Sequence, residues 1–198
     1  YFDESSVVYG TDITLSSTDY EGMNYSETQT LQDQATVTFQ DITRGSYILA
    51  ASKDADDYDR SQIMSFDASK IAQHLVWGGS LDESSNLLTD PDQLVSADAS
   101  NNGMVSSVDA TRVARFSMGF IDQLNDDDVF WKFLSEQGTE DIELNLADGL
   151  YPEGTLEKFS GILLGDVTGN WATTTNNNLV FDGANNSDGA NNRSAIER

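Results

Sequence analysis

Residues 98–109 read Asp98-Ala-Ser-Asn-Asn-Gly-Met-Val-Ser-Ser-Val-Asp109, and a helical pattern follows them. Oxygen-bearing side chains stand at positions 1, 3, 5, 9 and 12 of this stretch: Asp98, Ser100, Asn102, Ser106 and Asp109. This is the spacing of a twelve-residue calcium loop, which gathers about 6–8 oxygen ligands around the ion. Gly103 at position 6 allows the sharp turn that such a loop needs. The stretch therefore predicts a calcium ion that holds a fold together rather than a catalytic centre.

The composition is strongly acidic. The 198 residues include 34 acidic and 10 basic side chains, and the net charge is −24. Such a charge argues against nucleic acid as a partner, because binding needs basic neutralisation of phosphates, and it argues against docking on anionic membranes. It suits divalent cations, although most of the carboxylates are expected to form a solvated surface. The chain has no cysteine, which excludes disulfides and zinc–thiolate sites, and no apolar run of about 18 residues that predicts membrane insertion.

Residues 1–53 are predicted to form a small antiparallel β-sandwich. Short segments rich in β-branched and aromatic residues follow one another closely, some of them alternating with period 2. They are residues 7–9, 12–15, 28–31, 35–39 and 46–50. Further strands are expected at 129–133, 142–146 and 159–165. The expected fold class is therefore α+β.

Two segments repeat at an offset of 42 residues. Residues 65–72 align with 107–114, and Asp67 aligns with Asp109. Each aspartate is expected to close a loop and open a helix, since a carboxylate is favourable at a helix N-terminus. The two helices should pack together as a pseudo-symmetric pair. Asp90-Pro91 predicts the start of a shorter helix that leads into the loop.

The sequence divides into three expected parts: a sandwich domain at 1–53, a calcium-binding domain at 54–171 and a flexible Asn/Gly-rich tail at 172–198. The tail holds one strand-like island, Leu179-Val180-Phe181. The island has no evident partner within one copy, so it is a candidate for pairing with the sheet edge of a neighbour. Because the chain opens inside an expected strand, we expect it to be a processed fragment of a longer precursor.

The loop and its helix resemble type I dockerin modules, whose loops read D-x-N-x-D-G-x-[VI]-x-x-x-D. The matching residues are Asp98, Asn102, Gly103, Val105 and Asp109, with Ser100 at position 3. Residues 1–171 resemble bacterial cell-surface proteins in which a prealbumin-like (carboxypeptidase-regulatory-like) sandwich precedes a dockerin-like unit that ends in a GDVSGNW-type segment, here residues 165–171. The resemblance implies ligation by the side chains of Asp98, Ser100 and Asn102, by the Met104 carbonyl, by Ser106 through water and by Asp109. It also implies partner recognition at Ser69 and Thr111 by a cohesin-like domain.

The first repeat departs from this pattern and leaves two alternatives. Counting back from Asp67 gives Asp56 at position 1 but Arg60 at position 5, and arginine cannot ligate a cation. In one alternative the acidic run around Asp56 supplies carboxylates through an irregular loop. In the other the loop is split, and a distant segment with oxygens at positions 1, 3 and 5 completes the site closed by Asp67. The donors of that segment are Asp166, Thr168 and Asn170. One or two calcium ions are therefore expected.

Motifs of nucleophilic, phosphate-binding or zinc-dependent catalysis are not found in the sequence, and its single histidine, His74, stands on a predicted helix. We therefore expect a non-catalytic module for adhesion or assembly at the bacterial cell surface or outside the cell. One alternative is a subunit of a filament or surface layer, a homopolymer formed by strand exchange through Leu179-Val180-Phe181. A further alternative is an accessory domain of a polysaccharide-degrading enzyme.

Overall fold

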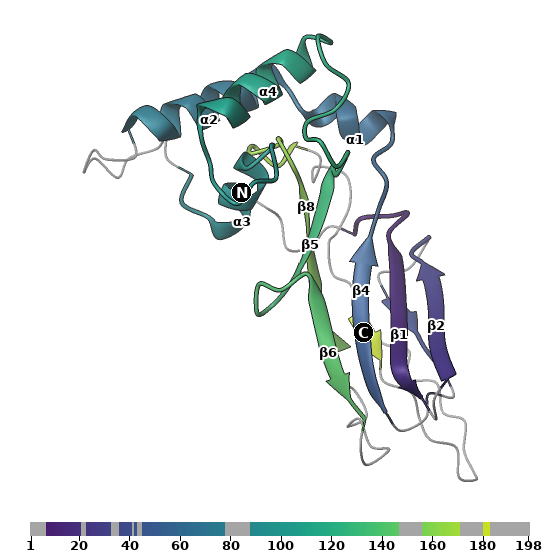
Figure 1. Ribbon diagram of the computed structural model, residues 1–198. Coiled ribbons are helices and arrows are strands. Elements are labelled where there is room, and N and C mark those ends of the chain that lie inside the picture. Colours follow the sequence, from purple (N-terminus) through teal and green to yellow (C-terminus); the bar gives the residue numbers. More distant parts are fainter. Residues whose placement is uncertain are drawn as a thin grey trace, which may run out of the picture.

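The computed structural model describes residues 7–20, 23–32, 36–40, 42, 45–77, 88–146, 156–170 and 180–182. The helices gather at one end, and a long two-stranded ribbon, β5 with β8, runs from them toward a four-stranded sheet (Figure 1). The helices are α1 (Asp57–Gln62), α2 (Ser65–Trp77), α3 (Pro91–Ala97) and α4 (Ser107–Ser117). The strands are β1 (Asp12–Tyr20), β2 (Met23–Thr30), β3 (Thr36–Thr38), β4 (Ser46–Ser52), β5 (Trp131–Ser135), β6 (Asp141–Asn145), β7 (Leu156–Glu157), β8 (Phe159–Leu163) and β9 (Val180–Asp182). The chain is thus an α+β protein. In the described part, no helix is long and apolar enough to cross a membrane.

The four-stranded sheet is antiparallel, with the strand order β2-β1-β4-β6. Its register places Leu15 opposite Leu49, and Leu49 opposite Ile142, so the apolar side chains of three strands share one face. All three are buried. Period-2 patterning therefore predicts these strands correctly, whereas residues 7–9 do not form a strand, although Val7 and Val8 are buried.

The expected boundary at residue 53 does not separate the strands of the two halves. β6 pairs with β4, and thus completes a sheet whose other strands come from the first 53 residues. β3 belongs to another sheet, which has the order β3-β9-β7. Both sheets therefore contain strands that lie far apart in the sequence: β6 is an edge strand of the first, and β9 is the middle strand of the second.

The strand-like island of the tail pairs within its own chain, which corrects the expectation that it lacks a partner there. Val180–Asp182 lies between β3, to which it is parallel, and β7, to which it is antiparallel. Leu179 and the remainder of the tail lie outside the described residues. Exchange of this strand between copies was inferred from its lack of a partner, and the pairing of β9 with β3 and β7 removes that reason.

The helices α2 and α4 begin two residues before Asp67 and Asp109, earlier than predicted. Each aspartate stands in the first turn, and its side chain accepts a hydrogen bond from the backbone of the residue that precedes the helix: Met64 at 2.8 Å and Ser106 at 2.7 Å. This is the carboxylate half of a capping box, in which a residue inside the first turn satisfies an exposed amide. The predicted start of α3 is confirmed, with Asp90 as its N-cap and Pro91 in the first turn.

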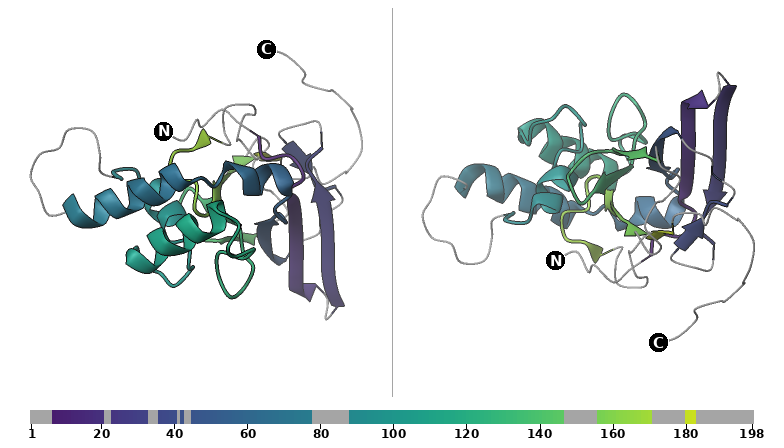
Figure 2. Two further views of the ribbon diagram at one scale, coloured as in Figure 1. Left: turned by 90° about the horizontal axis from the view of Figure 1, so that it is seen from above. Right: turned by 90° about the horizontal axis from the view of Figure 1, so that it is seen from below.

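Helices α2 and α4 pack side by side and run antiparallel (Figure 2). Ile71 and Val113 are fully buried, whereas Leu75, one turn after Ile71, is 38% exposed. One contact agrees with this direction: Arg60 of α1, five residues before α2 begins, donates a hydrogen bond to the carbonyl of Asp122, five residues after α4 ends, at 3.0 Å. The start of α2 therefore lies near the end of α4.

A buried charge pair joins the sheet to the helical end. Lys53, which follows β4, forms an ion pair with Asp59 of α1, and each side chain is only 8% exposed. Trp131 of β5 donates its indole N–H to the same carboxylate at 3.0 Å, and the lysine amine lies 5.2 Å from the centre of the indole ring. Three elements thus meet at one carboxylate, which fixes their relative positions.

Replacing Lys53 with Met should lower the free energy of unfolding by about 3 kcal/mol, because it leaves a buried carboxylate without its cation. Lys158→Met is the matched control, since the Lys158–Glu136 pair is exposed and 3.8 Å apart, and its loss should cost less than about 1 kcal/mol. Denaturant unfolding of both variants measures the difference. Equal losses would contradict a joining role for the buried pair.

Candidate metal sites

The predicted calcium loop forms a tight bend between α3 and α4, and we call residues 98–109 the contiguous loop. Two of its residues have left-handed backbone conformations, Asn101 with φ 57° and Gly103 with φ 86°. The conformation of Gly103 is one that side-chain-bearing residues adopt only with strain. The glycine at position 6 thus serves the purpose that the sequence pattern assigns to it.

Backbone amides hold both carboxylates of the contiguous loop in place. Asp98 accepts hydrogen bonds from the amides of Asn102 at 3.1 Å and Gly103 at 2.7 Å. Asp109 accepts from the amides of Ser100 and Ser106, at 2.8 and 2.7 Å. Asp109 is fully buried and Asp98 is 8% exposed. The predicted first and last ligands are therefore brought to one small region and oriented by the chain between them.

The remaining predicted ligands of the contiguous loop line the same bend. The Ser100 hydroxyl lies 3.4 Å from Asp98 Oδ1, and the Ser106 hydroxyl donates to Asp109 Oδ2 at 2.9 Å. Asn102 Oδ1 accepts the amide of Met104 at 3.0 Å. The Met104 side chain is 69% exposed, so only its backbone carbonyl is suited to ligation.

A second group of oxygens forms where two distant segments meet, and we call it the split site. It consists of Asp67 at the start of α2 and of Asp166, Thr168 and Asn170, which follow β8. The Thr168 amide and hydroxyl both approach Asp67 Oδ1, at 3.2 and 2.8 Å. The same hydroxyl lies 3.1 Å from Asp166 Oδ1 and 2.9 Å from Asn170 Oδ1. The structure thus brings together all four residues of the split-loop alternative.

The two groups share one hydrogen-bond scheme. In each, the position 3 amide (Ser100 or Thr168) donates to the closing aspartate, and the position 5 amide (Asn102 or Asn170) donates to Oδ1 of the opening aspartate. The residue at position 4 is left-handed in both, with φ 57° at Asn101 and φ 66° at Gly169. The segment 166–170 therefore has the same backbone form as the first part of the contiguous loop.

The other alternative for the first repeat does not form. Asp56 caps helix α1, where its side chain accepts the amide of Asp59 at 2.9 Å, and Asp59 itself is paired with Lys53. Asp56 is therefore a helix cap rather than position 1 of a loop. Sequence reasoning also missed Gln62, whose Oε1 accepts a hydrogen bond from the side-chain amide (Nδ2) of Asn170 at 3.0 Å. No local pattern indicates this contact, because the residues are 108 positions apart.

Burial affects the charge of the split site. Asp67 is fully buried, and loss of hydration raises the pKa of its carboxyl, while hydrogen bonds from Met64 and Thr168 act in the opposite direction. In the described part, no group of three or more His, Cys, Asp or Glu side chains could hold a metal. The contiguous loop and the split site have two carboxylates each. Hydroxyl, amide and carbonyl oxygens would have to complete either donor set, a combination that suits calcium.

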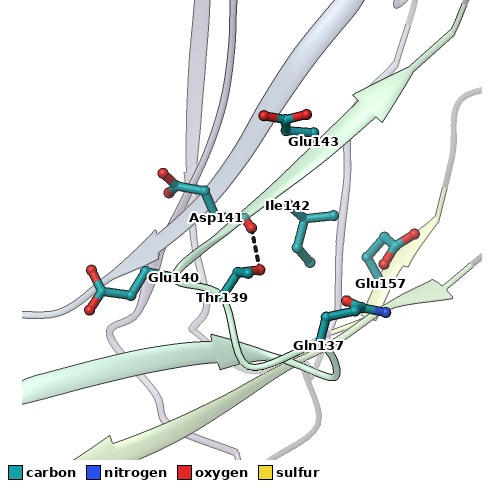
Figure 3. A pocket seen from close by; sticks show the side chains of 7 residues that line it. All are labelled: Gln137, Thr139, Glu140, Asp141, Ile142, Glu143 and Glu157. Atoms are coloured by element: carbon teal, nitrogen blue, oxygen red, sulfur yellow. Dashed lines mark hydrogen bonds between the residues drawn. The ribbon is translucent and has the colours of Figure 1, made fainter.

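An acidic hollow of about 640 Å³ lies beside the turn that joins β5 to β6. Its lining includes the carboxylates of Glu140, Asp141, Glu143 and Glu157, which point in different directions (Figure 3). Glu140 is paired with Lys132 at 3.2 Å. Because the carboxylates do not converge, the hollow lacks the geometry of a cation site.

His74 and two of the predicted partner-binding residues lie on the helix pair, and two more lie in β9. His74 accepts the backbone amide of Leu88 through Nδ1 at 3.3 Å, which gives it a role in holding the chain that leads to α3. Ser69 and Thr111 are exposed at equivalent places on α2 and α4. Val180 and Phe181 belong to β9.

Comparisons with protein-family models, curated proteins and solved structures found no match to this chain.

The raised pKa of Asp67 predicts a pH dependence in calcium-free protein. Because the fold favours the protonated acid, the charged carboxylate costs stability as the pH rises above its unfolded value near 3.8. The free energy of unfolding of wild type, relative to Asp67→Asn, should therefore fall between pH 4 and pH 7 in chelator. Denaturant unfolding measures this difference, with the exposed Asp127→Asn as the control for loss of one carboxylate. A difference that grows with pH would contradict the prediction.

Proposed function

We propose that this protein is a non-catalytic, calcium-stabilised module that assembles with a protein partner outside the cell or on its surface. The contiguous loop carries the proposal, because carboxylate, hydroxyl, amide and carbonyl oxygens are the ligands that calcium prefers. Asp98, Ser100 and Asn102 would hold the ion through their side chains, Met104 through its carbonyl, Ser106 through water and Asp109 by closing the shell. The ion would supply the positive charge that two neighbouring carboxylates require.

The buried state of these carboxylates supports a bound cation. An ionised carboxylate that leaves water is costly unless it is paired or coordinates a metal. Asp109 is fully buried, and no ion pair in the described residues includes Asp98 or Asp109. Calcium would therefore stabilise the folded loop and, through Asp109, the first turn of α4.

The outer surface of the helix pair supports a docking role. Phe66 and Val108, equivalent under the offset of 42, are 55% and 51% exposed, and the equivalent pair Val76 and Met118 is 76% and 56% exposed. Apolar side chains gathered at both ends of a helix pair are typical of interaction surfaces. We call these four residues, with the exposed Ser69 and Thr111 between them, the helix face.

The charged residues of α2 and α4 support a partner that carries carboxylates. Asp67 and Asp109 are the only carboxylates of α2 and α4, and both are buried. The helices also carry the exposed Arg115 and Lys70, whose amine lies 5.5 Å from the centre of the Phe66 ring, whereas Arg112 is paired with Asp126 at 3.2 Å. The chain as a whole has 34 acidic residues. The partner would therefore present carboxylates beside apolar side chains, in the manner of a cohesin-like domain, and electrostatic complementarity would set its orientation.

Calorimetric titration tests the calcium proposal. Wild type should bind calcium, and a calcium concentration about 100 times Kd should add about 2.7 kcal/mol to the free energy of unfolding per site. Asp98→Ala should abolish binding at the contiguous loop, whereas Asp127→Ala, which removes an exposed carboxylate, should retain it. If wild type binds no calcium, and its melting temperature is unchanged by chelator, the proposal is wrong.

The partner role is tested with the double variant Phe66→Asp, Val108→Asp, which adds charge at both ends of the helix face. Immobilised wild type should retain a specific protein from a cell-surface extract in calcium, and the variant should lose at least about 90% of it, since each added carboxylate costs more than about 1 kcal/mol in a buried contact. Ser26→Asp, Ser46→Asp, at two exposed positions of the four-stranded sheet, is the control. Equal retention by the helix-face variant would contradict this role.

A further inference from the structure

We propose that the side chains of Lys53 and Asp59 join in a covalent amide, which the protein forms by itself after it folds. This modification goes beyond the proposed function and does not rest on it, since neither residue belongs to a candidate metal site or to the helix face. The starting point is the buried ion pair of these two residues, in which the lysine amine lies directly against Asp59 Oδ2. The product is an isopeptide bond from Lys53 Nζ to Asp59 Cγ.

The carboxyl group of Asp59 is held in the way that suits acyl transfer. Besides its contact with the lysine, Oδ2 accepts the indole N–H of Trp131 at 3.0 Å and the backbone amide of Asp56 at 3.2 Å. Two N–H donors on one oxygen stabilise the negative charge that grows there when a nucleophile attacks the adjoining carbon. Among the described residues no donor holds Oδ1, so Oδ1 is the oxygen that leaves.

The surroundings of the pair exclude water. Each side chain is only 8% exposed. The Trp131 ring, whose centre lies 5.2 Å from the lysine amine, stacks on Phe133, and both aromatic residues are buried. The turn at Gly10 also covers the lysine, because a Cβ atom there would lie 3.6 Å from Lys53 Cε. Loss of hydration makes both charges costly, and proton transfer within the pair leaves a neutral amine, which is the nucleophilic form of lysine.

The reaction balances without a further reactant. After one proton has passed from the ammonium group to the carboxylate, Nζ attacks Cγ and the bond from Cγ to Oδ1 breaks. Oδ1 leaves as water with two of the three ammonium protons, and the third stays on the amide nitrogen. Oδ2 becomes the amide oxygen and keeps both of its N–H donors. The fold holds the reacting groups in contact, which in well-oriented intramolecular reactions is equivalent to about 10⁵ M or more of one reactant.

The bond would fasten α1 to the end of the four-stranded sheet. Lys53 directly follows β4, Asp59 lies in the first turn of α1, and Trp131 brings β5 to the same point (Figure 1). An ion pair is lost when either partner loses its charge, whereas an amide persists even in the unfolded chain. The junction between the sheet and the helical end would therefore be permanent.

Mass spectrometry of the denatured full chain tests the proposal. Wild type that has folded should be lighter than its sequence by the mass of one water molecule. Trypsin should leave residues 45–60 as a single peptide, because an acylated Lys53 is no longer cleaved, and fragmentation should give no break between residues 53 and 59. The full sequence mass after several days in the folded state would overturn the proposal, as would a water loss located elsewhere in the chain.

Substitutions of the two reacting residues separate the covalent bond from the ion pair. Lys53→Arg keeps a positive charge, but a guanidinium group stays protonated in proteins, so this variant should retain its full mass. Asp59→Asn should lose ammonia instead of water, because the group that leaves its Cγ is then an amine. A water loss in Lys53→Arg equal to that of wild type would contradict the bond.

The rate of the mass change tests the role of the donors on Oδ2. Trp131→Phe keeps an aromatic ring but removes the indole N–H, and should slow the loss of water at least about tenfold. Lys158→Arg, at the exposed pair with Glu136, is the control and should react as wild type does. Circular dichroism reports whether each variant has folded. An unchanged rate in folded Trp131→Phe would contradict stabilisation of Oδ2 by the indole.

Discussion

The fold depends on the burial of carboxylates at the starts of α2 and α4. Asp67 and Asp109 are fully removed from solvent, and each also satisfies the amide that precedes its helix. An ionised group in such a place is stable only if its charge is compensated. In the proposed module, oxygens on the partner segments, around Asp98 in one case and Asp166 in the other, would turn this cost into a binding preference for a hard divalent ion. Helix capping, loop closure and the proposed ion binding would therefore be one arrangement rather than three.

The sheets and the helical end are joined by a different interaction. The carboxylate of Asp59 meets the amine of Lys53 and the indole of Trp131, and these residues come from α1, the end of β4 and β5. Beside it, β6 completes the sheet of β1, β2 and β4. The strands of the first 53 residues thus share a sheet with β6, a strand that follows the two repeats. Ions bound near the helices would therefore affect the stability of the whole chain.

The proposed module separates its tasks along the molecule. The ions would lie on the inner side of the helix pair and set its geometry, while the outer side presents exposed apolar residues and cations in an otherwise acidic protein. Because α2 and α4 run antiparallel and carry equivalent residues, the helix face repeats its chemistry at both ends. A partner that binds it would contact a surface that exists only when both helix starts are held in place. Calcium would then control assembly without contacting the partner.

Local sequence predicts the contiguous loop, because its candidate ligands lie within twelve residues and the spacing, the glycine and the helix start are all neighbours in the chain. It also predicts most strands through period-2 burial, and the pairing of the two repeats through the offset of 42. Only the folded chain shows that Asp166 rather than Asp56 lies beside Asp67, and that Gln62 lies beside Asn170. Only the folded chain also pairs β6 with β4 and β9 with β3, strands from the first 52 residues. These are contacts between segments far apart in the chain, and local patterns of hydrophobicity and charge carry no record of them. The capping role of Asp56 was equally hidden, since the same residue type serves as helix cap and as metal ligand, and only its neighbours in space select one role.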